Sequence, residues 1–275
     1  MSKANVPSSA VIHQTAIIDQ SAKIGENVKI GPYSIIGKNV TIGDNTAIGP
    51  FCVIENTIMG KDNEIISSAS IGVKPQDLSY DGIQSMVIMG DGNQIRESVT
   101  IHRSTSLEHP TKIGNKCLFM ANSHVAHDCI IGNNVIMVNS AGIAGHVEVG
   151  DNAILSGLSA VHQFVRIGRF AMVSGLSGLP LDMPPFCRAS GGRAKLVGLN
   201  TVGLRRGGFT REAIYALNDA YKQIFLSTDT MVESFAKMKA QNPTKEVMEL
   251  ITFCENTKRG VTNARMKSAA KNKEE

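Results

Sequence analysis

Residues 23–50 carry one aliphatic side chain at every sixth position, in the stretch KIGENVKIGPYSIIGKNVTIGDNTAIGP. The pair isoleucine-glycine recurs along it, from Ile24-Gly25 to Ile48-Gly49. A period of six matches neither the 3.6 residues of a helical turn nor the alternation of an ordinary strand. A fixed period of this kind is typical of a solenoid, in which each repeat buries its apolar side chain against the next repeat.

The period extends over most of the chain. Steps of six from Ile12 meet only isoleucine as far as Ile54, and after a phase slip, steps of six from Met89 stay apolar as far as Leu179. Three six-residue sides close a triangular coil of eighteen residues, with Gly, Asn and Asp at its corners. We therefore expect a mainly β chain in which residues 1–184 form a parallel β-helix, with coils about 4.8 Å apart.

Two segments depart from the period. VKPQDLSYDGIQSM (73–86) and RSTSLEHP (103–110) are polar and contain proline, which predicts two loops expelled from corners of the coil. The second segment contains Leu107, which keeps the apolar phase, so the period counts it among the inward side chains.

From residue 185 the pattern becomes helical. The stretch FTREAIYALNDAYKQIFLS has an N-cap candidate in Thr210 and apolar residues at helical spacing. We expect a small helical domain over 185–262 and a disordered basic tail over 263–275.

Composition excludes several classes of function. The net charge of +4 is too small for a general nucleic-acid binder. No apolar run reaches the roughly 18 residues of a membrane span, and the N-terminal MSKANVPSSAVIHQ lacks the apolar core of a signal peptide. The five cysteines form no C-x-x-C pair, which indicates reduced, buried thiols in a cytoplasmic protein.

Histidines gather on consecutive coils. Positions 125, 143 and 161 are eighteen residues apart, so they fall in one column, and His127, His146 and His162 each follow it within three residues. His124 precedes the first of them. A lone histidine is usually an ordinary surface or core residue, whereas an aligned cluster indicates a function.

Clustered imidazoles could hold zinc, or one could act as a general base while the others bind substrate. The neighbours Asp128, Gln163, Gly142 and Gly145 favour the second chemistry, because they supply orienting groups and backbone donors.

Several motifs resemble one family. "TIHRST", "ANSHVAHDC", "AGHVEV", "AVHQF", "DMPPF" and "GLRRGGF" occur in the order found in the UDP-N-acetylglucosamine O-acyltransferases that open lipid A biosynthesis. The resemblance runs from about residue 10 to about residue 260. The isoleucine-glycine repeat itself resembles the hexapeptide-repeat proteins, which implies a left-handed parallel β-helix followed by the helical domain.

The resemblance implies a reaction and its partners. An (R)-3-hydroxyacyl group would pass from acyl carrier protein, where phosphopantetheine carries it, to the glucosamine 3-hydroxyl of UDP-N-acetylglucosamine. The enzyme would be a cytoplasmic homotrimer with its sites in clefts between prisms, and it would need no cofactor and no metal.

The resemblance also implies residue roles. His127 would be the general base, Asp128 would orient it, and Gly145 would offer its N–H to the tetrahedral intermediate. The residues implied to bind substrate are Asp77, His124, His146, His162, Gln163, Asn200 and Arg206. Gly175 and Arg193 occupy positions that set acyl length, and a glycine at 175 leaves room for a longer chain. Cys129 is interpreted as a packing residue.

Three positions differ from the family pattern. Ser79 stands where a lysine is common, Val202 where an acidic residue is common, and Arg193 where a histidine is common. The sequence leaves open the acyl length, the order of substrate binding and a 3-amino instead of a 3-hydroxyl acceptor. Other open alternatives are a hexapeptide N-acyltransferase, an acetyl-CoA enzyme, a zinc-dependent γ-class carbonic anhydrase and a purely structural solenoid.

Overall fold

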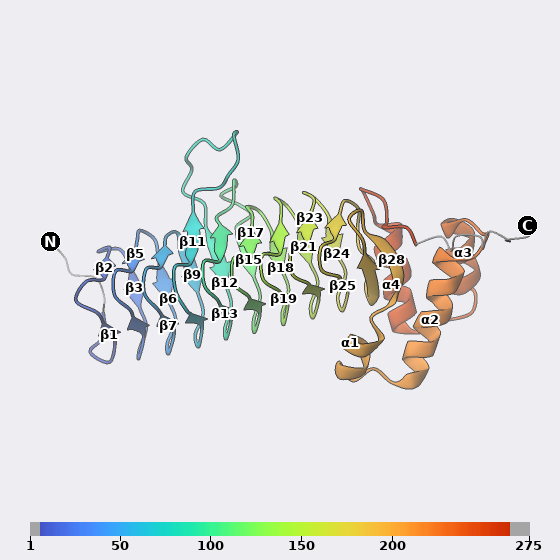
Figure 1. The fold of residues 1–275 in the computed structure, drawn as a ribbon, viewed down its shortest axis with the longest axis horizontal. Helices are drawn as coiled ribbons and strands as arrows, with labels where there is room; N and C mark the ends of the chain where they lie inside the picture. Colours follow the sequence, from blue (N-terminus) through green and yellow to red (C-terminus); the bar gives the residue numbers. More distant parts are fainter. Residues whose placement is uncertain (1–5, 265–275) are drawn as a thin grey trace, which may run out of the picture.

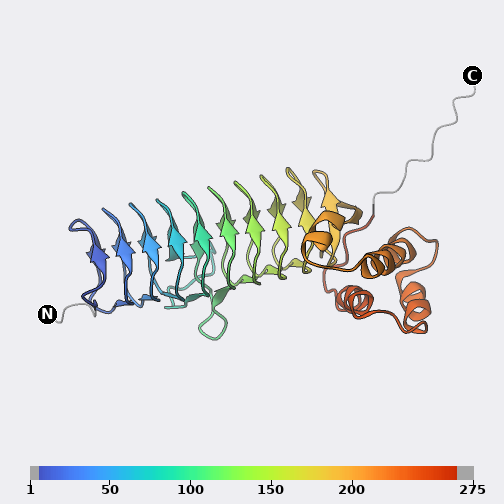
Figure 2. The same cartoon turned by 90° about the horizontal axis from the view of Figure 1, so that it is seen from below.

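The computed structural model describes residues 6–264, which form a long three-sided prism with helices at its C-terminal end (Figure 1). The expected fold class is confirmed, because short parallel strands build the prism and four helices follow it. Seen from below, the coils stack side by side along the axis of the prism (Figure 2).

Three sheets form the sides of the prism. The nine-stranded sheet contains β2 (Ile17–Ile18), β5 (Ile35–Ile36), β8 (Val53–Ile54), β11 (Ser70–Val73), β14 (Thr100–His102), β17 (His124–Val125), β20 (Gly142–Ile143), β23 (Ala160–Val161) and β26 (Gly178–Leu179). The eight-stranded sheet contains β3 (Lys23–Ile24), β6 (Thr41–Ile42), β9 (Thr57–Met59), β12 (Val87–Met89), β15 (Thr111–Ile113), β18 (Ile130–Ile131), β21 (Glu148–Val149) and β24 (Arg166–Ile167).

The eleven-stranded sheet forms the third side and continues beyond the coils. It contains β1 (Val11–Ile12), β4 (Lys29–Ile30), β7 (Ala47–Ile48), β10 (Glu64–Ile65), β13 (Gln94–Ile95), β16 (Leu118–Phe119), β19 (Ile136–Met137), β22 (Ile154–Leu155), β25 (Met172–Val173), β27 (Cys187–Ser190) and β28 (Lys195–Leu199). Along the chain, each coil visits the nine-, the eight- and then the eleven-stranded sheet.

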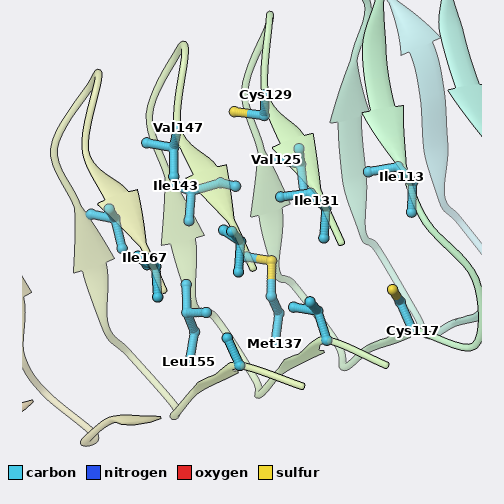
Figure 3. Close-up of a cluster of buried hydrophobic side chains, with 14 of the residues drawn as sticks. Ile113, Cys117, Val125, Cys129, Ile131, Met137, Ile143, Val147, Leu155 and Ile167 are labelled. Carbon is cyan, nitrogen blue, oxygen red and sulfur yellow. The ribbon is translucent and has the colours of Figure 1, made fainter. Parts of the chain in front are cut away.

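The periodic side chains form the core. Val125 pairs with Ile143, and Ile143 pairs with Val161, so the predicted column is confirmed. All three are buried, and Figure 3 shows Val125 and Ile143 pointing inward beside residues of neighbouring coils. Each fully buried aliphatic side chain contributes roughly 1.5–3 kcal/mol, so this column and its counterparts on the other two sides stabilise the stack of coils.

The prediction for Leu107 is wrong. Its side chain is 70% exposed, because residues 103–110 leave the prism instead of completing a side. The inward column stays in phase around both loops, as Ile101 pairs with Ile71 before it and with Val125 after it.

Both loops leave the prism along one edge, where the nine-stranded sheet turns into the eight-stranded sheet. Residues 74–86 connect β11 to β12, and residues 103–110 connect β14 to β15. Figure 1 shows the longer loop projecting from the shaft beside β11. We call the turns of this edge at residues 126–129, 144–147 and 162–165 the histidine edge, because they carry His127, His146 and His162.

The C-terminal part begins with a hairpin where the sequence predicts helix. β27 and β28 pair antiparallel and extend the eleven-stranded sheet, and Cys187, Ala189 and Leu196 are buried in them. The helices α1 (Thr201–Arg206), α2 (Arg211–Phe225), α3 (Met231–Lys239) and α4 (Lys245–Glu255) follow. Thr210 caps α2 as expected, because its hydroxyl accepts from the Ala213 N–H.

The segment after α4 returns to the prism. Asp182 forms a bridge with Val261, and the carbonyl of Asn263 accepts from the Leu196 N–H at 2.8 Å. The first two residues of the predicted tail are therefore paired with the fold, and residues 265–275 lie outside the described part. Every helix between residues 6 and 264 is too short or too polar to span a lipid bilayer.

Candidate active site

His127 and Asp128 lie in the turn between β17 and β18. Asp128 has a φ of 61°, in the left-handed region that aspartate tolerates better than most residues. Adjacent residues of a strand point to opposite faces, but at this corner the chain bends from the nine-stranded to the eight-stranded side, with Asp128 in the left-handed region. Both therefore project outward together, and His127 Nδ1 lies 2.6 Å from Asp128 Oδ2.

Loop 103–110 surrounds the Asp128 carboxylate with donors. The Ser104 hydroxyl donates to Oδ1, the Thr105 N–H donates to Oδ1 at 3.0 Å, and the Thr105 hydroxyl donates to Oδ2 at 2.8 Å. Burial opposes ionisation of Asp128, but the hydrogen bonds from Ser104, His127 and Thr105 outweigh it, and its pKa lies below the ordinary value. At neutral pH the group is a carboxylate and cannot donate, so the hydrogen bond between the two side chains has His127 Nδ1–H as its donor and Asp128 Oδ2 as its acceptor.

Loop 74–86 brings a second carboxylate to the other side of the imidazole. Asp77 Oδ2 lies 3.6 Å from His127 Nε2, too far for a direct hydrogen bond. The N–H and the hydroxyl of Ser79 both donate to Asp77 Oδ1 at 2.7 Å, and these bonds lower the pKa of Asp77. Ser79 thus orients Asp77 in this chain.

The next coil contributes Gly145 and His146. A Cβ atom on Gly145 would lie 2.5 Å from His127 Cε1, so only glycine leaves space for the imidazole. The Gly145 N–H makes no hydrogen bond to protein within residues 6–264. The His146 ring stands at 90° to the His127 ring and stacks on Phe164 of the following coil, at centroid distances of 5.3 and 4.5 Å.

His124 lies on the outer face of the nine-stranded sheet, just before the histidine edge. Its Nδ1 is 2.7 Å from the Thr100 hydroxyl. Its ring packs edge to face against the His102 ring, with 4.9 Å between the two ring centroids. Burial lowers the pKa of His124, and burial together with the neighbouring His124 and His127 lowers the pKa of His102 to about 4. His102 is therefore neutral at physiological pH.

His162 and Gln163 lie one coil further along the same edge, and both are exposed. His162 lines a hollow of about 570 Å³ together with Arg193 of the β27–β28 turn. Gly175 lies on a different edge, between the eleven- and nine-stranded sheets, and a Cβ there would meet only the Gly157 carbonyl, at 3.2 Å.

Asn200 and Arg206 lie apart from the histidine edge. With Val202 they line a hollow of about 570 Å³ against the outer face of the eleven-stranded sheet. Arg206 is exposed, whereas Asn200 is buried and caps α1, since its Oδ1 accepts from the Gly203 N–H. Its Nδ2 donates to the Phe170 carbonyl at 2.9 Å, so both polar atoms of the amide contact protein.

The histidine edge could geometrically hold a metal. One ligand atom from each of His127, Asp128 and His146 lies within 4.8 Å of the others. This arrangement therefore admits both chemistries that the sequence left open, zinc binding and base catalysis. Burial raises the pKa of the Cys129 thiol to about 12, which fits a packing role.

Sequence reasoning missed the residues that hold the site in place. Arg103, Ser104 and Thr105 belong to loop 103–110, and Tyr80 belongs to loop 74–86. The polar run RSTS directly after a strand was the available signal, but only the folded loops show which groups these residues contact.

Comparison with known proteins identifies a related family. Residues 182–262 match the family model "Udp N-acetylglucosamine O-acyltransferase; Domain 2". Residues 21–56 and 110–145 match the bacterial transferase hexapeptide model.

Individual relatives match over most of the chain. The chain is 48% identical over 253 residues to the acyl-(acyl-carrier-protein)–UDP-N-acetylglucosamine O-acyltransferase of Thermodesulfovibrio yellowstonii, covering 91% of this chain and 98% of that protein. It is 46% identical over 208 residues to the enzyme of the same name from Myxococcus xanthus, covering 75% and 81%. The crystal structure of the UDP-N-acetylglucosamine O-acyltransferase of Moraxella catarrhalis is similar, with a TM-score of 0.88, 42% identity and coverage of 92% and 99%.

Proposed function

The chain belongs to the UDP-N-acetylglucosamine O-acyltransferase family, and on that premise we propose that it transfers an (R)-3-hydroxyacyl group from acyl carrier protein to the glucosamine 3-hydroxyl of UDP-N-acetylglucosamine. This acyl transfer belongs to lipid A biosynthesis. The zinc hydratase and the purely structural solenoid are not favoured, because the relatives that cover most of the chain carry the acyltransferase name.

One observation supports the chemistry most directly: an ionised Asp128 accepts a hydrogen bond from the Nδ1–H of His127. This fixes the tautomer in which Nε2 is basic, and Nε2 faces the space beside Asp77. The sugar hydroxyl bound there loses its proton to Nε2 while its oxygen attacks the thioester carbonyl. The C–S bond then breaks, and the proton passes from Nε2 to the departing thiolate of the carrier.

Gly145 supports the second part of the reaction. Its N–H has no protein acceptor within residues 6–264 and lies beside the His127 ring, so it can donate to the oxyanion of the tetrahedral intermediate. The proposed reaction needs no protein nucleophile, because positioning two bound substrates can itself supply roughly 7–11 kcal/mol.

The direct test uses purified protein, UDP-N-acetylglucosamine and 3-hydroxyacyl carrier proteins of several lengths, with product detected by mass spectrometry. We expect acylated UDP-sugar from the wild type and a fall of roughly 10²–10⁴ in rate for His127→Ala. His13→Ala, at an exposed histidine of the first coil, is the matched control. The proposed reaction is refuted if no donor yields product, and the base is misassigned if His127→Ala keeps full activity.

The acceptor atom and the acyl length belong to the same proposal. Parallel reactions with the 3-amino analogue of the UDP-sugar decide between ester and amide products. Gly175 carries no side chain, and the only atom near a Cβ there is the Gly157 carbonyl oxygen, so we expect Gly175→Met to shift the preferred donor to a shorter chain, with Gly157→Ala as control. An unchanged preference would remove Gly175 from the acyl site.

A homotrimer completes the site. The eleven-stranded sheet carries the hollow with Arg206, whereas His127 projects from the edge between the other two sheets. A nucleotide bound by the Arg206 fork and a sugar at His127 can belong to one ligand if neighbouring prisms share a cleft. Co-expressed His127→Ala and Arg206→Ala chains would then regain about a quarter of the sites by random assortment, whereas no recovery would contradict a shared cleft.

The proposal contains no resident cofactor or metal. Although His127, Asp128 and His146 could bind an ion, the base needs Nε2 free and Nδ1 protonated. Exhaustive dialysis against a chelator is expected to leave the rate unchanged, and a loss restored by zinc would contradict this. The five cysteines are free and buried, which is typical of proteins in a reducing compartment. We propose that this compartment is the cytoplasm, and cell fractionation tests the location.

A further inference from the structure

Arg103 makes a buried set of contacts outside the reaction described above. It follows β14 directly and is 7% exposed. Its Nη1 donates to the Gly72 carbonyl at 3.1 Å and lies 3.8 Å from a Glu55 carboxylate oxygen. Its Nε and Nη2 both donate to the Tyr80 hydroxyl, at 3.1 and 2.9 Å. A guanidinium buried at this cost, with two of its three nitrogens bonded to one hydroxyl of loop 74–86, indicates a specific task.

Tyr80 transmits this contact to the candidate active site. The hydroxyl that accepts from Arg103 also donates to the Ile83 carbonyl, which fastens the loop to itself. The Tyr80 N–H donates to the Asp77 carbonyl at 3.2 Å, and Ser79 between them holds the Asp77 carboxylate. From Arg103 to His127, each link in this series is a hydrogen bond except the last, the 3.6 Å space between Asp77 and His127.

Little else fixes the projecting half of loop 74–86. Leu78 at its tip is fully exposed, and within the loop only Pro75 and Ser85, near its two ends, are buried. Ordering an otherwise free loop residue costs about 1–2 kcal/mol of backbone entropy, so an unfastened loop would spread Asp77 over many positions.

We propose that Arg103 and Tyr80 are positioning residues that hold Asp77 against His127 Nε2 and thereby set the affinity for the acceptor sugar. The inference rests on the proposed function and goes beyond it, because neither residue reaches the reacting atoms. Because Asp77 is the residue proposed to bind the acceptor sugar, we expect the effect of breaking this link on the acceptor and not on the carrier-bound donor.

Tyr80→Phe is the sharpest variant, because it removes the hydroxyl and keeps the ring that lies 5.5 Å from the Arg103 guanidinium. We expect the KM for the UDP-sugar to rise about tenfold, equivalent to about 1.4 kcal/mol, with kcat and the KM for the acyl carrier within twofold. Tyr215→Phe, at an exposed tyrosine of α2, is the matched control and should change nothing.

A double-mutant cycle tests whether Tyr80 acts through Asp77. In an Asp77→Asn background, Tyr80→Phe should add less than twofold to the KM for the UDP-sugar, whereas independent roles would multiply the two effects. Thermolysin cleavage before Leu78 should be about tenfold faster in Tyr80→Phe, with an unchanged thermal midpoint.

Three results would overturn the inference. The first is an unchanged KM for the UDP-sugar in Tyr80→Phe, and the second is multiplicative effects of the two substitutions in the cycle. The third is a fall in the kcat of Tyr80→Phe as large as the rise in its KM, together with a lower thermal midpoint. Arg103→Lys keeps the charge but loses the two-pronged contact, so it should reproduce the Tyr80→Phe profile if it folds. Failure of the proposed function is distinguishable, because then the wild type itself forms no product.

Discussion

A single methyl group added at Gly145 should displace the His127 ring and so disable the base, although His127 itself is not substituted. Gly145 lies in the turn between β20 and β21, and its φ is outside the left-handed region, so alanine is compatible with the backbone. Alanine also keeps the N–H proposed to stabilise the oxyanion. The substitution therefore tests only whether the His127 ring lies where the structure places it.

The distances give the size of the effect. The new Cβ would lie 2.5 Å from Cε1, 2.7 Å from Nε2 and 3.1 Å from Nδ1 of His127. Ordinary contacts of such atoms begin near 3.4 Å, so the ring has to retreat by about 1 Å. A displacement of about 1 Å at a reacting group can cost 10²-fold in rate, or about 2.7 kcal/mol in the activation barrier.

Steady-state kinetics with acyl carrier protein and UDP-sugar would measure this effect. We expect kcat of Gly145→Ala to fall about 100-fold, with both KM values and the thermal midpoint close to wild type. Gly157→Ala is the matched control, since a Cβ there meets the Asn139 carbonyl at 3.4 Å and a Val138 carbon at 3.6 Å. Wild-type kcat in Gly145→Ala would refute the placement of the base, and a loss shared by Gly157→Ala would refute the steric explanation.

Three further predictions follow from neighbouring groups. Asp128→Asn removes the acceptor that fixes the His127 tautomer and should lower kcat roughly 10²–10⁴-fold. Because the folded-state pKa of Asp128 is depressed, its contribution to stability is fully present above the unfolded pKa near 4 and is lost as the pH falls through the lower folded value. The free energy of urea unfolding between pH 3 and 5 should therefore depend less steeply on pH in the variant, and an identical dependence would contradict this. Asp182→Ala removes the partner of Arg166 and of the Thr257 hydroxyl, at 3.2 and 2.8 Å, and should lower the free energy of unfolding by about 2–3 kcal/mol, whereas a change under 0.5 kcal/mol would show that the segment after α4 is held by other contacts. A thiol reagent at pH 8 should leave Cys129 unmodified and activity intact, since burial raises its pKa to about 12, and rapid labelling of Cys129 with loss of activity would oppose the packing role.

The six-residue period was sufficient to predict the prism and the alignment of its histidines. Because every complete coil uses the same number of residues, residues eighteen apart must stack, and His127, His146 and His162 therefore share one edge. The period failed at Leu107, which is apolar and in phase but lies in an expelled loop. It also missed the hairpin of β27 and β28, whose pairing depends on the end of the eleven-stranded sheet being available.

The sequence by itself determined which coil each candidate residue occupies, since backbone length per coil is a local property that repeats. Only the tertiary structure decided how the residues face one another. Asp77 reaches His127, and Thr105 reaches Asp128, because two loops without any period fold back onto the edge from which they leave. Their conformations depend on single hydrogen bonds between residues distant in the chain, such as that between Arg103 and Tyr80, and such contacts leave no periodic trace in the sequence.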